Sequence, residues 1–243
     1  AAINEATKTN LYTYSTAAVP NNRGAAVYVP RGTYNINTSL CVTNDPAAAV
    51  ANKYFTMFGD GQSTVLMTAQ SSAFRMLSVS QMLRCSIKNL VFVGGDTTYA
   101  NTTDGCIGLN LTNVQSVELN GIETVQTSIG LWFEGIKTSQ DMRIENSKLT
   151  GRIALYGAPA RATFDHVTLS PQKIVGTDDY GVAMFLTNAP FVNFYNSMIA
   201  DGPCLPVILS NCMYVTIEGC YMEGGLTNVI VTGSGPSGSP PGL

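Results

Sequence analysis

Charged side chains are scarce in this sequence of 243 residues, where they make up 12% of the total. A typical soluble domain carries about 25%. The formal net charge of −3 provides no basic surface for nucleic acid. Long apolar runs are also missing, because Thr, Asn, Ser or Gly interrupts each one before the roughly 18 to 20 residues that a membrane-spanning helix needs. We therefore expect neither nucleic acid nor a membrane among the partners.

Histidine is scarce as well, and closely spaced pairs of cysteines are missing. His166 is the single histidine, and the six cysteines include no pair spaced as Cys-x-x-Cys. A zinc site of Cys and His ligands cannot be assembled from this set. We expect no metal and no cofactor, and we interpret the cysteines as free, buried thiols. Hydrophobic residues reach 45%, which excludes a disordered chain.

A short pattern recurs from residue 85 onward: an apolar residue, any residue, then Asn, Gly or His, two further residues, and usually an apolar one. Its third positions are Asn89, Gly121, Asn146, His166, Asn196 and Gly219. Successive third positions are 20 to 32 residues apart, as expected when loops of different length interrupt a constant unit. Because Asn and Gly tolerate a left-handed backbone, we predict a sharp turn at each of these positions.

A second pattern, rich in β-branched residues and alternating with period two, follows each copy of the first. Such runs, bounded by Asn or Gly, are typical of strands. Strands that recur every 20 to 32 residues with no helix between them predict an all-β fold, a right-handed, single-stranded parallel β-helix. In such a coil, equivalent residues of successive turns stack about 4.8 Å apart.

This stacking assigns residues to columns. Two inward columns are predicted to be Ile87, Leu119, Ile144, Phe164, Phe194 and Ile217, and Cys85, Val117, Met142, Ala162, Val192 and Val215. One outward column is predicted to be Lys88, Asn120, Glu145, Asp165, Tyr195 and Glu218. A second outward column is predicted to be Asn110, Trp132, Tyr156, Phe185, Ser210 and Thr232.

The N-terminal part of the chain carries a more specific signal. Residues 24–36, with the stretch Tyr28-Val29-Pro30-Arg31-Gly32-Thr33-Tyr34, resemble the opening strand of the pectate-lyase-like β-helix superfamily, which includes phage tailspikes. Residues 1–6 resemble the short helix that usually caps such a coil, and residues 55–66 resemble the turn of the helix that normally follows. Because the sequence starts abruptly and without a signal-peptide pattern, we expect a further segment before it.

The domain organisation follows from these signals. We predict a parallel β-helix domain over residues 1–233, with an N-terminal cap over 1–20, first coils over 21–84 and regular coils over 85–233. Residues 234–243 are rich in Gly, Pro and Ser and are interpreted as a tail or linker.

Carboxylates in one outward column are the candidate catalytic groups. Glycoside hydrolysis needs two carboxylates about 5 to 9.5 Å apart. Glu145 and Asp165 are predicted to occupy adjacent coils, and Glu218 lies two coils beyond Asp165 as an alternate partner. The competing interpretation is a solvated face that simply carries some acids.

Aromatic side chains in the outward columns are the candidate binding groups. Trp132, Tyr156 and Phe185, here called the aromatic strip, are predicted on three consecutive coils, and Tyr195 lies between Asp165 and Glu218. The aromatic strip can stack on sugar rings, or it can pack against another subunit. The sequence leaves both open.

The resemblance implies a tailspike or tail-fibre domain in the virion tail, outside the cell. We expect it to form a homotrimer and to bind bacterial surface polysaccharide. Whether it also hydrolyses the glycan is left open, with hydrolysis preferred to elimination. Two alternatives stay in play. One is a secreted polysaccharide lyase or hydrolase of the same superfamily, and the other is a non-catalytic shaft of a trimeric fibre.

Overall fold

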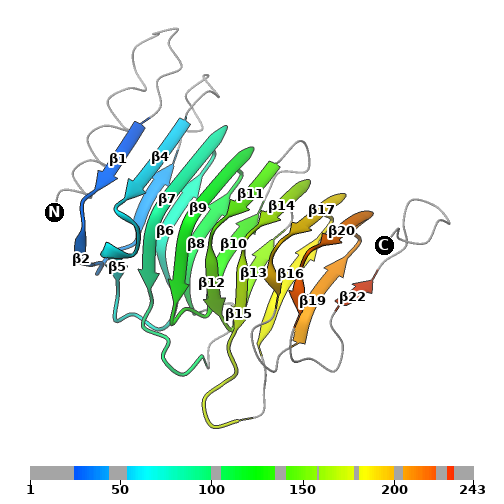
Figure 1. Ribbon diagram of the computed structural model, residues 1–243. Helices are drawn as coiled ribbons and strands as arrows, with labels where there is room; N and C mark the ends of the chain where they lie inside the picture. Colours follow the sequence, from blue (N-terminus) through cyan, green and yellow to red (C-terminus); the bar gives the residue numbers. More distant parts are fainter. Residues whose placement is uncertain are drawn as a thin grey trace, which may run out of the picture.

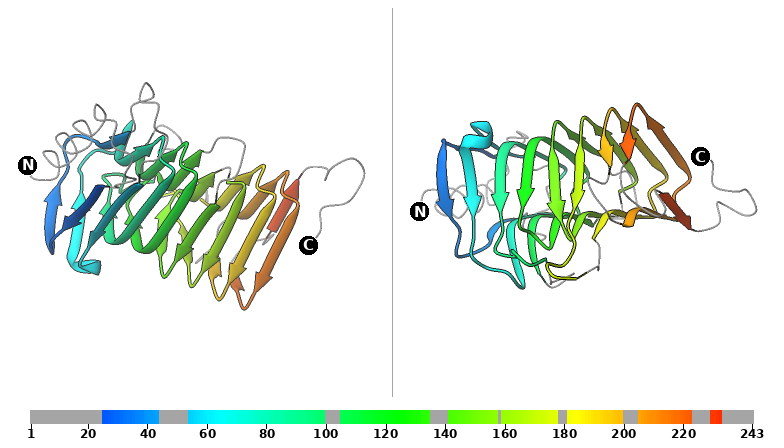
Figure 2. Two further views of the ribbon diagram at one scale, coloured as in Figure 1. Left: turned by 90° about the horizontal axis from the view of Figure 1, so that it is seen from above. Right: turned by 60° about the horizontal axis from the view of Figure 1, so that its bottom comes forward.

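The computed structural model describes residues 25–43, 54–99, 105–134, 141–157, 159–177, 181–199, 205–222 and 229–232. Within them the chain consists of strands, loops and one short 3-10 helix, η1 (Gly61–Ser63). The strands form three columns, each of which runs along the molecule from its N-terminal to its C-terminal end (Figures 1 and 2). The predicted N-terminal cap lies outside the described residues, as does the predicted tail.

The first column contains β1 (Ala25–Val29), β4 (Tyr54–Gly59), the first part of β7 (Arg84–Val93) and of β9 (Ser116–Val125), β11 (Asp141–Glu145), β14 (Arg161–Asp165), β17 (Phe191–Tyr195) and β20 (Tyr214–Glu218). The second contains β2 (Gly32–Asn35), β5 (Thr64–Met67), the remainder of β7 and β9, β12 (Lys148–Gly151), β15 (Thr168–Pro171), β18 (Met198–Ile199) and β21 (Tyr221–Met222). The third contains β3 (Leu40–Thr43), β6 (Phe74–Ser80), β8 (Cys106–Thr112), β10 (Ile129–Glu134), β13 (Ile153–Gly157), β16 (Val182–Thr187), β19 (Leu205–Ser210) and β22 (Val229–Thr232).

Every pairing between these strands is parallel, and each strand pairs with its equivalent in the preceding and following coil. The chain therefore winds as a right-handed parallel β-helix, which confirms the predicted fold class. Figure 1 shows the first-column strands β1, β4, β7, β9, β11, β14, β17 and β20 side by side in chain order.

The turn between the first and second columns has the predicted left-handed backbone. Asn89, Gly121, Asn146, His166, Asn196 and Gly219 all have φ between 46° and 65°. Hydroxyl groups that follow some of these residues satisfy backbone groups that the turn frees. Ser147 Oγ accepts the Ile122 N–H at 3.1 Å and donates to the Glu145 carbonyl at 2.6 Å. Ser197 Oγ plays the same part for Val167, so neighbouring coils are tied together at their corners.

The inward columns form one hydrophobic core along the axis of the coil. Both predicted inward columns have the predicted register. Phe164 and Phe194 stack inside the core with ring centroids 4.6 Å apart. Burial weakens only in the last coil, where the side chain of Ile217 is exposed.

The cysteines of the described residues are free, as predicted, but they differ in burial. Cys85, Cys106 and Cys212 are buried, and burial raises the pKa of the Cys106 thiol to about 11. Cys41 is exposed, so the prediction of a buried thiol is wrong there. Cys41 lies in an outward column and pairs with Ser78 of β6.

The second outward column departs from its prediction after Phe185. The partner of Phe185 in the next coil is Ile208, and Ile208 pairs in turn with Ile230. Ser210 and Thr232 belong instead to the column of Thr187. The offset to the turn explains the register, because Phe185 and Ile208 each lie three residues before an Asn with positive φ, Asn188 or Asn211.

Replacing Asn146 tests the left-handed turn. Asn146→Ala puts a side chain that cannot hydrogen-bond to the nearby backbone at a φ of 46°, which costs about 1 to 2 kcal/mol of stability. Asn146→Gly relieves that strain, because Gly has no Cβ. We expect the Ala variant to unfold at a lower denaturant concentration than the Gly variant, followed by circular dichroism. Equal midpoints for the two variants would contradict the role assigned to the turn.

Candidate functional site

A line of eight outward side chains runs along the first column, parallel to the axis of the coil. This axial line consists of Tyr28, Phe58, Lys88, Asn120, Glu145, Asp165, Tyr195 and Glu218. The last six are the residues that the sequence predicted, in the predicted order. Tyr28 and Phe58 were missed, although the two strands that carry them, β1 and β4, align residue for residue with β7.

Glu145 and Asp165 lie at directly paired positions of β11 and β14. Parallel strands are about 4.8 Å apart, so the two carboxylates leave the sheet side by side. Their side chains are partly covered, with 19% of Glu145 and 34% of Asp165 exposed. Glu145 forms an ion pair with Arg143 through Oε1 and accepts a hydrogen bond from Asn120 Nδ2 at 3.2 Å through Oε2.

Asp165 has its partners on one oxygen. His166 Nδ1 lies 2.8 Å from Asp165 Oδ1, and Asn196 Nδ2 donates to the same atom at 3.4 Å. Within the part of the chain that the structure describes, Asp165 Oδ2 has no hydrogen-bond partner. His166 thus combines the predicted turn with contact to a candidate acid, and Asp165 keeps one oxygen available to a ligand.

The remaining members of the axial line differ in exposure. Tyr195 lies between Asp165 and Glu218, as predicted, and Glu218 is exposed on β20. Lys88 forms an ion pair with Glu118 of the neighbouring column at 2.7 Å. That hydrogen bond holds the pKa of Glu118 below its ordinary value.

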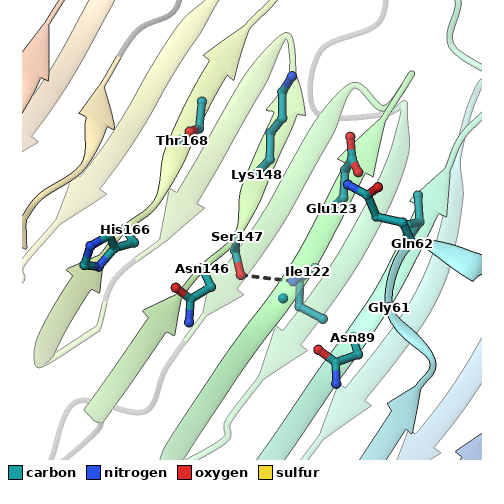
Figure 3. Close-up of a pocket in the computed structure, with 12 residues that line it drawn as sticks. Gly61, Gln62, Asn89, Ile122, Glu123, Asn146, Ser147, Lys148, His166 and Thr168 are labelled. Atoms are coloured by element: carbon teal, nitrogen blue, oxygen red, sulfur yellow. Dashed lines mark hydrogen bonds between the residues drawn. The ribbon is translucent and has the colours of Figure 1, made fainter.

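A groove of about 430 Å³ follows the corner between the first and second columns (Figure 3). We call it the corner groove. One side is formed by the turn residues Asn89, Gly121, Asn146 and His166, and the other by Gln62, Val91, Glu123, Lys148 and Thr168. Ile122 and Ser147 lie between the two sides, joined by their hydrogen bond. The lining of the groove thus includes both Lys148 and His166, which follows Asp165 of the axial line in the chain.

Two residues of opposite charge occupy paired positions of neighbouring strands in this groove. Glu123 of β9 pairs with Lys148 of β12, and Lys148 pairs with Thr168 of β15. The sequence did not reveal the groove, because its lining alternates between two strand columns that the repeat pattern treats separately. A signal was present in the second column, two residues after each turn, where the charge changes from Glu123 in one coil to Lys148 in the next.

The aromatic strip lies on the other sheet, on β10, β13 and β16. The rings of Trp132 and Tyr156 have centroids 4.5 Å apart, and those of Tyr156 and Phe185 are 5.4 Å apart and nearly parallel. All three side chains are half-buried rather than fully exposed. The strip therefore forms a continuous stack, but it is separate from the axial line.

Within the described residues, no group of three or more His, Cys, Asp and Glu side chains gathers in a way that could hold a metal ion. No helix in the described part of the chain has the length and apolar character needed to cross a membrane.

No protein-family model and no curated protein sequence matches this chain. Among solved structures, pectin methylesterase from Yersinia enterocolitica is similar, with a TM-score of 0.56 and 10% identity over 89% of this chain and 92% of that one. A pectin methylesterase in complex with a hexasaccharide has a TM-score of 0.49 and 9% identity, over 86% of this chain and 74% of that one. ORF18 of Geobacillus virus E2 has a TM-score of 0.42 and 11% identity, over 86% of this chain and 52% of that one. The first similarity shows a shared β-helix fold.

Replacing Lys88 by Met tests the charge pairing beside the axial line. Because Lys88 is the main cause of the lowered pKa of Glu118, that pKa should rise toward its ordinary value in the variant. The contribution of the pair to stability is present above the unfolded-state pKa of Glu118 and is lost as the pH falls through the lowered folded-state value. The variant should therefore lose less stability in acid.

Carbon NMR titration of the Glu118 carboxyl measures this pKa, with Glu118→Gln used to assign the signal. Arg143→Met is the matched control, since Arg143 is the weakest of the contributions to the lowered pKa of Glu118, and its shift should be smaller. A larger shift in the Arg143 variant would show that the ion pair with Lys88 is not the main cause.

Proposed function

We propose that this chain is the β-helix domain of a phage tailspike or tail fibre that binds bacterial surface polysaccharide along the axial line. The observation that carries the proposal is the juxtaposition of Glu145 and Asp165. Like charges at paired positions of neighbouring strands are destabilising, so a purely structural surface gains nothing from this arrangement.

The surrounding side chains offset that cost. Arg143 neutralises Glu145, while His166 and Asn196 contact one oxygen of Asp165. A glycan presents many hydroxyl groups, which donate hydrogen bonds to carboxylates such as the open oxygen of Asp165. Shared fold alone does not establish a function, so the proposal rests on these residues rather than on the similar structures.

Hydrolysis of the bound glycan is the second candidate, and the same pair of carboxylates favours it. Retaining glycosidases hold their two carboxyl groups about 5 to 5.5 Å apart, close to the spacing of paired parallel strands. In this scheme Glu145 attacks the anomeric carbon, Asp165 protonates the departing oxygen, and the glycosidic C–O bond breaks. Water, deprotonated by Asp165, then releases the sugar from Glu145.

Glu218 is the alternate partner of Asp165. It lies two strand pairings away, through Tyr195, which corresponds to about 10 Å. That separation is near the upper end of the range for inverting enzymes, in which a water molecule occupies the space between the two groups. Tyr195 is placed to contact the sugar between them.

The proposed assembly is a homotrimer in the virion tail, outside the cell, with the β-helix over residues 1–233 and a linker over 234–243. The aromatic strip is the proposed contact with a second copy. The rings of Tyr156 and Phe185 stack nearly parallel and cover each other's faces, which leaves less ring face for a sugar, whereas another subunit could bury the strip as a whole.

Incubation with a panel of capsular and pectic polysaccharides tests the proposed function. We expect the protein to bind at least one capsular polysaccharide, measured by calorimetry or affinity electrophoresis. If the glycan is also cut, release of reducing ends should fall at least about 100-fold in Glu145→Gln and in Asp165→Asn, since each variant removes one of the two groups that the reaction needs.

Thr216→Ala is the matched control, because Thr216 lies in another outward column of the same face. Activity on pectic polysaccharides that depends on added calcium would instead favour the secreted lyase. Binding to no polysaccharide in the panel would favour the structural shaft.

Light scattering on the purified protein tests the assembly. We expect three times the mass of one chain, and Tyr156→Ser, which interrupts the aromatic strip, should dissociate the trimer by removing buried aromatic surface. Emission from Trp132, the only tryptophan, should shift to the red in that variant. A monomeric wild-type protein, or a trimer unaffected by the substitution, would remove the strip from the interface.

A further inference from the structure

Two neighbouring aromatic side chains stand exposed at the N-terminal end of the axial line. Tyr28 and Phe58 occupy paired positions of β1 and β4, and 51% and 38% of their side chains are exposed. Their ring centroids are 5.2 Å apart and the planes are tilted by 31°, so neither ring fully covers the other. Core aromatics such as Phe164 and Phe194 are buried, so core packing does not account for this pair.

The ring of Tyr28 is held in place. Its hydroxyl donates to both carboxylate oxygens of Asp60, at 2.8 and 3.1 Å, and this hydrogen bond holds the pKa of Tyr28 above its ordinary value. Asp60 is itself fixed, because it accepts the Arg31 N–H at 2.9 Å and its own N–H donates to Thr64 Oγ1 at 2.8 Å. An aromatic ring that is ordered before binding loses little conformational entropy when a ligand packs against it.

The pair is continuous with the polar part of the axial line. Phe58 pairs with Lys88, and Asn120 and Glu145 follow at successive coils. Three strand pairings separate Phe58 from Glu145, about 14 Å along the axis. Gly61 and Gln62, which directly follow Asp60 in the chain, line the corner groove, so this end of the line adjoins the groove as well.

We propose that Tyr28 and Phe58 form an aromatic subsite for a sugar ring, so that the bound glycan lies parallel to the axis of the coil, with one sugar on this pair and another beside Glu145 and Asp165. The inference rests on the proposed function and adds to it the direction of the glycan and the length needed for full affinity. A sugar ring offers an apolar face of C–H groups to the aromatic pair, and its hydroxyl groups reach Asp60 and Lys88.

A second exposed aromatic pair provides a matched control. Phe191 and Tyr214 stack at 5.2 Å on the same face, and Arg161 lies over the ring of Phe191. They occupy the first position of β17 and β20, four residues before the axial line, and so belong to a different column. Removing this pair deletes a similar amount of exposed aromatic surface without touching the line.

The test uses size-fractionated fragments of a polysaccharide that the wild-type protein binds, with affinity measured by calorimetry. We expect wild-type affinity to rise once the fragments are long enough to reach from Glu145 to Phe58. Tyr28→Ala and Phe58→Ala should each lose about tenfold for long fragments and be unchanged for short ones, whereas Phe191→Ala should bind both like wild type. Tyr28→Phe, which keeps the aromatic ring, should retain most of the higher affinity for long fragments.

Circular dichroism and thermal melting establish that each variant is folded. If Tyr28→Ala misfolds, the affinities of long and short fragments for Phe58→Ala still test the subsite. If long fragments bind the folded Tyr28 and Phe58 variants as tightly as wild type, the subsite is wrong while the proposed function stands. If wild type binds no polysaccharide, the proposed function fails and the subsite fails with it. An equal loss in Phe191→Ala would place the glycan off the axial line.

Discussion

In-register parallel pairing between coils is the constraint on which the rest of this molecule depends. It brings residues 20 to 37 positions apart in the sequence to within about one strand spacing of each other. Every side chain is thereby assigned to a line that faces either the core or the solvent. The core is continuous because the inward lines are apolar from coil to coil, and any surface site must be built from an outward line.

The pairing is maintained at the corners. From Asn89 onward, each coil turns between the first and second columns through a residue with positive φ, which Gly adopts without strain and which Asn and His tolerate better than most residues. Hydroxyl groups of Ser147 and Ser197 then satisfy backbone N–H groups of the preceding coil. The same turn residues, Asn146 and His166 among them, form one side of the corner groove, so the positions that close the coil also shape the surface beside the acids.

The turn residues made most of the fold predictable from the sequence. Their spacing fixed the coils, and counting back from them placed Glu145 beside Asp165. The same count would have placed Ile208 beside Phe185, since both lie three residues before a turn Asn. Counting forward from the first residue of each apolar run instead produced the wrong pair, Ser210. Tyr28 was missed because its strand was interpreted through a family resemblance rather than as a coil. The corner groove depends on side-chain conformations across two columns, which a repeat pattern does not contain.

Columns with a structural task keep the same chemistry from coil to coil. From Asn89 to Gly219 the turn column holds Asn, Gly and His, and the inward columns hold apolar side chains. In another turn, Asn211 Nδ2 donates to Asn188 Oδ1 at 2.6 Å. The axial line instead passes through aromatic, cationic, amide and carboxylate groups, and it sets two carboxylates side by side where a repeated amide would stabilise the stack directly. Stacking between coils gives no reason for that variation. An extended glycan, which presents different groups along its length, is the ligand that we propose for the line.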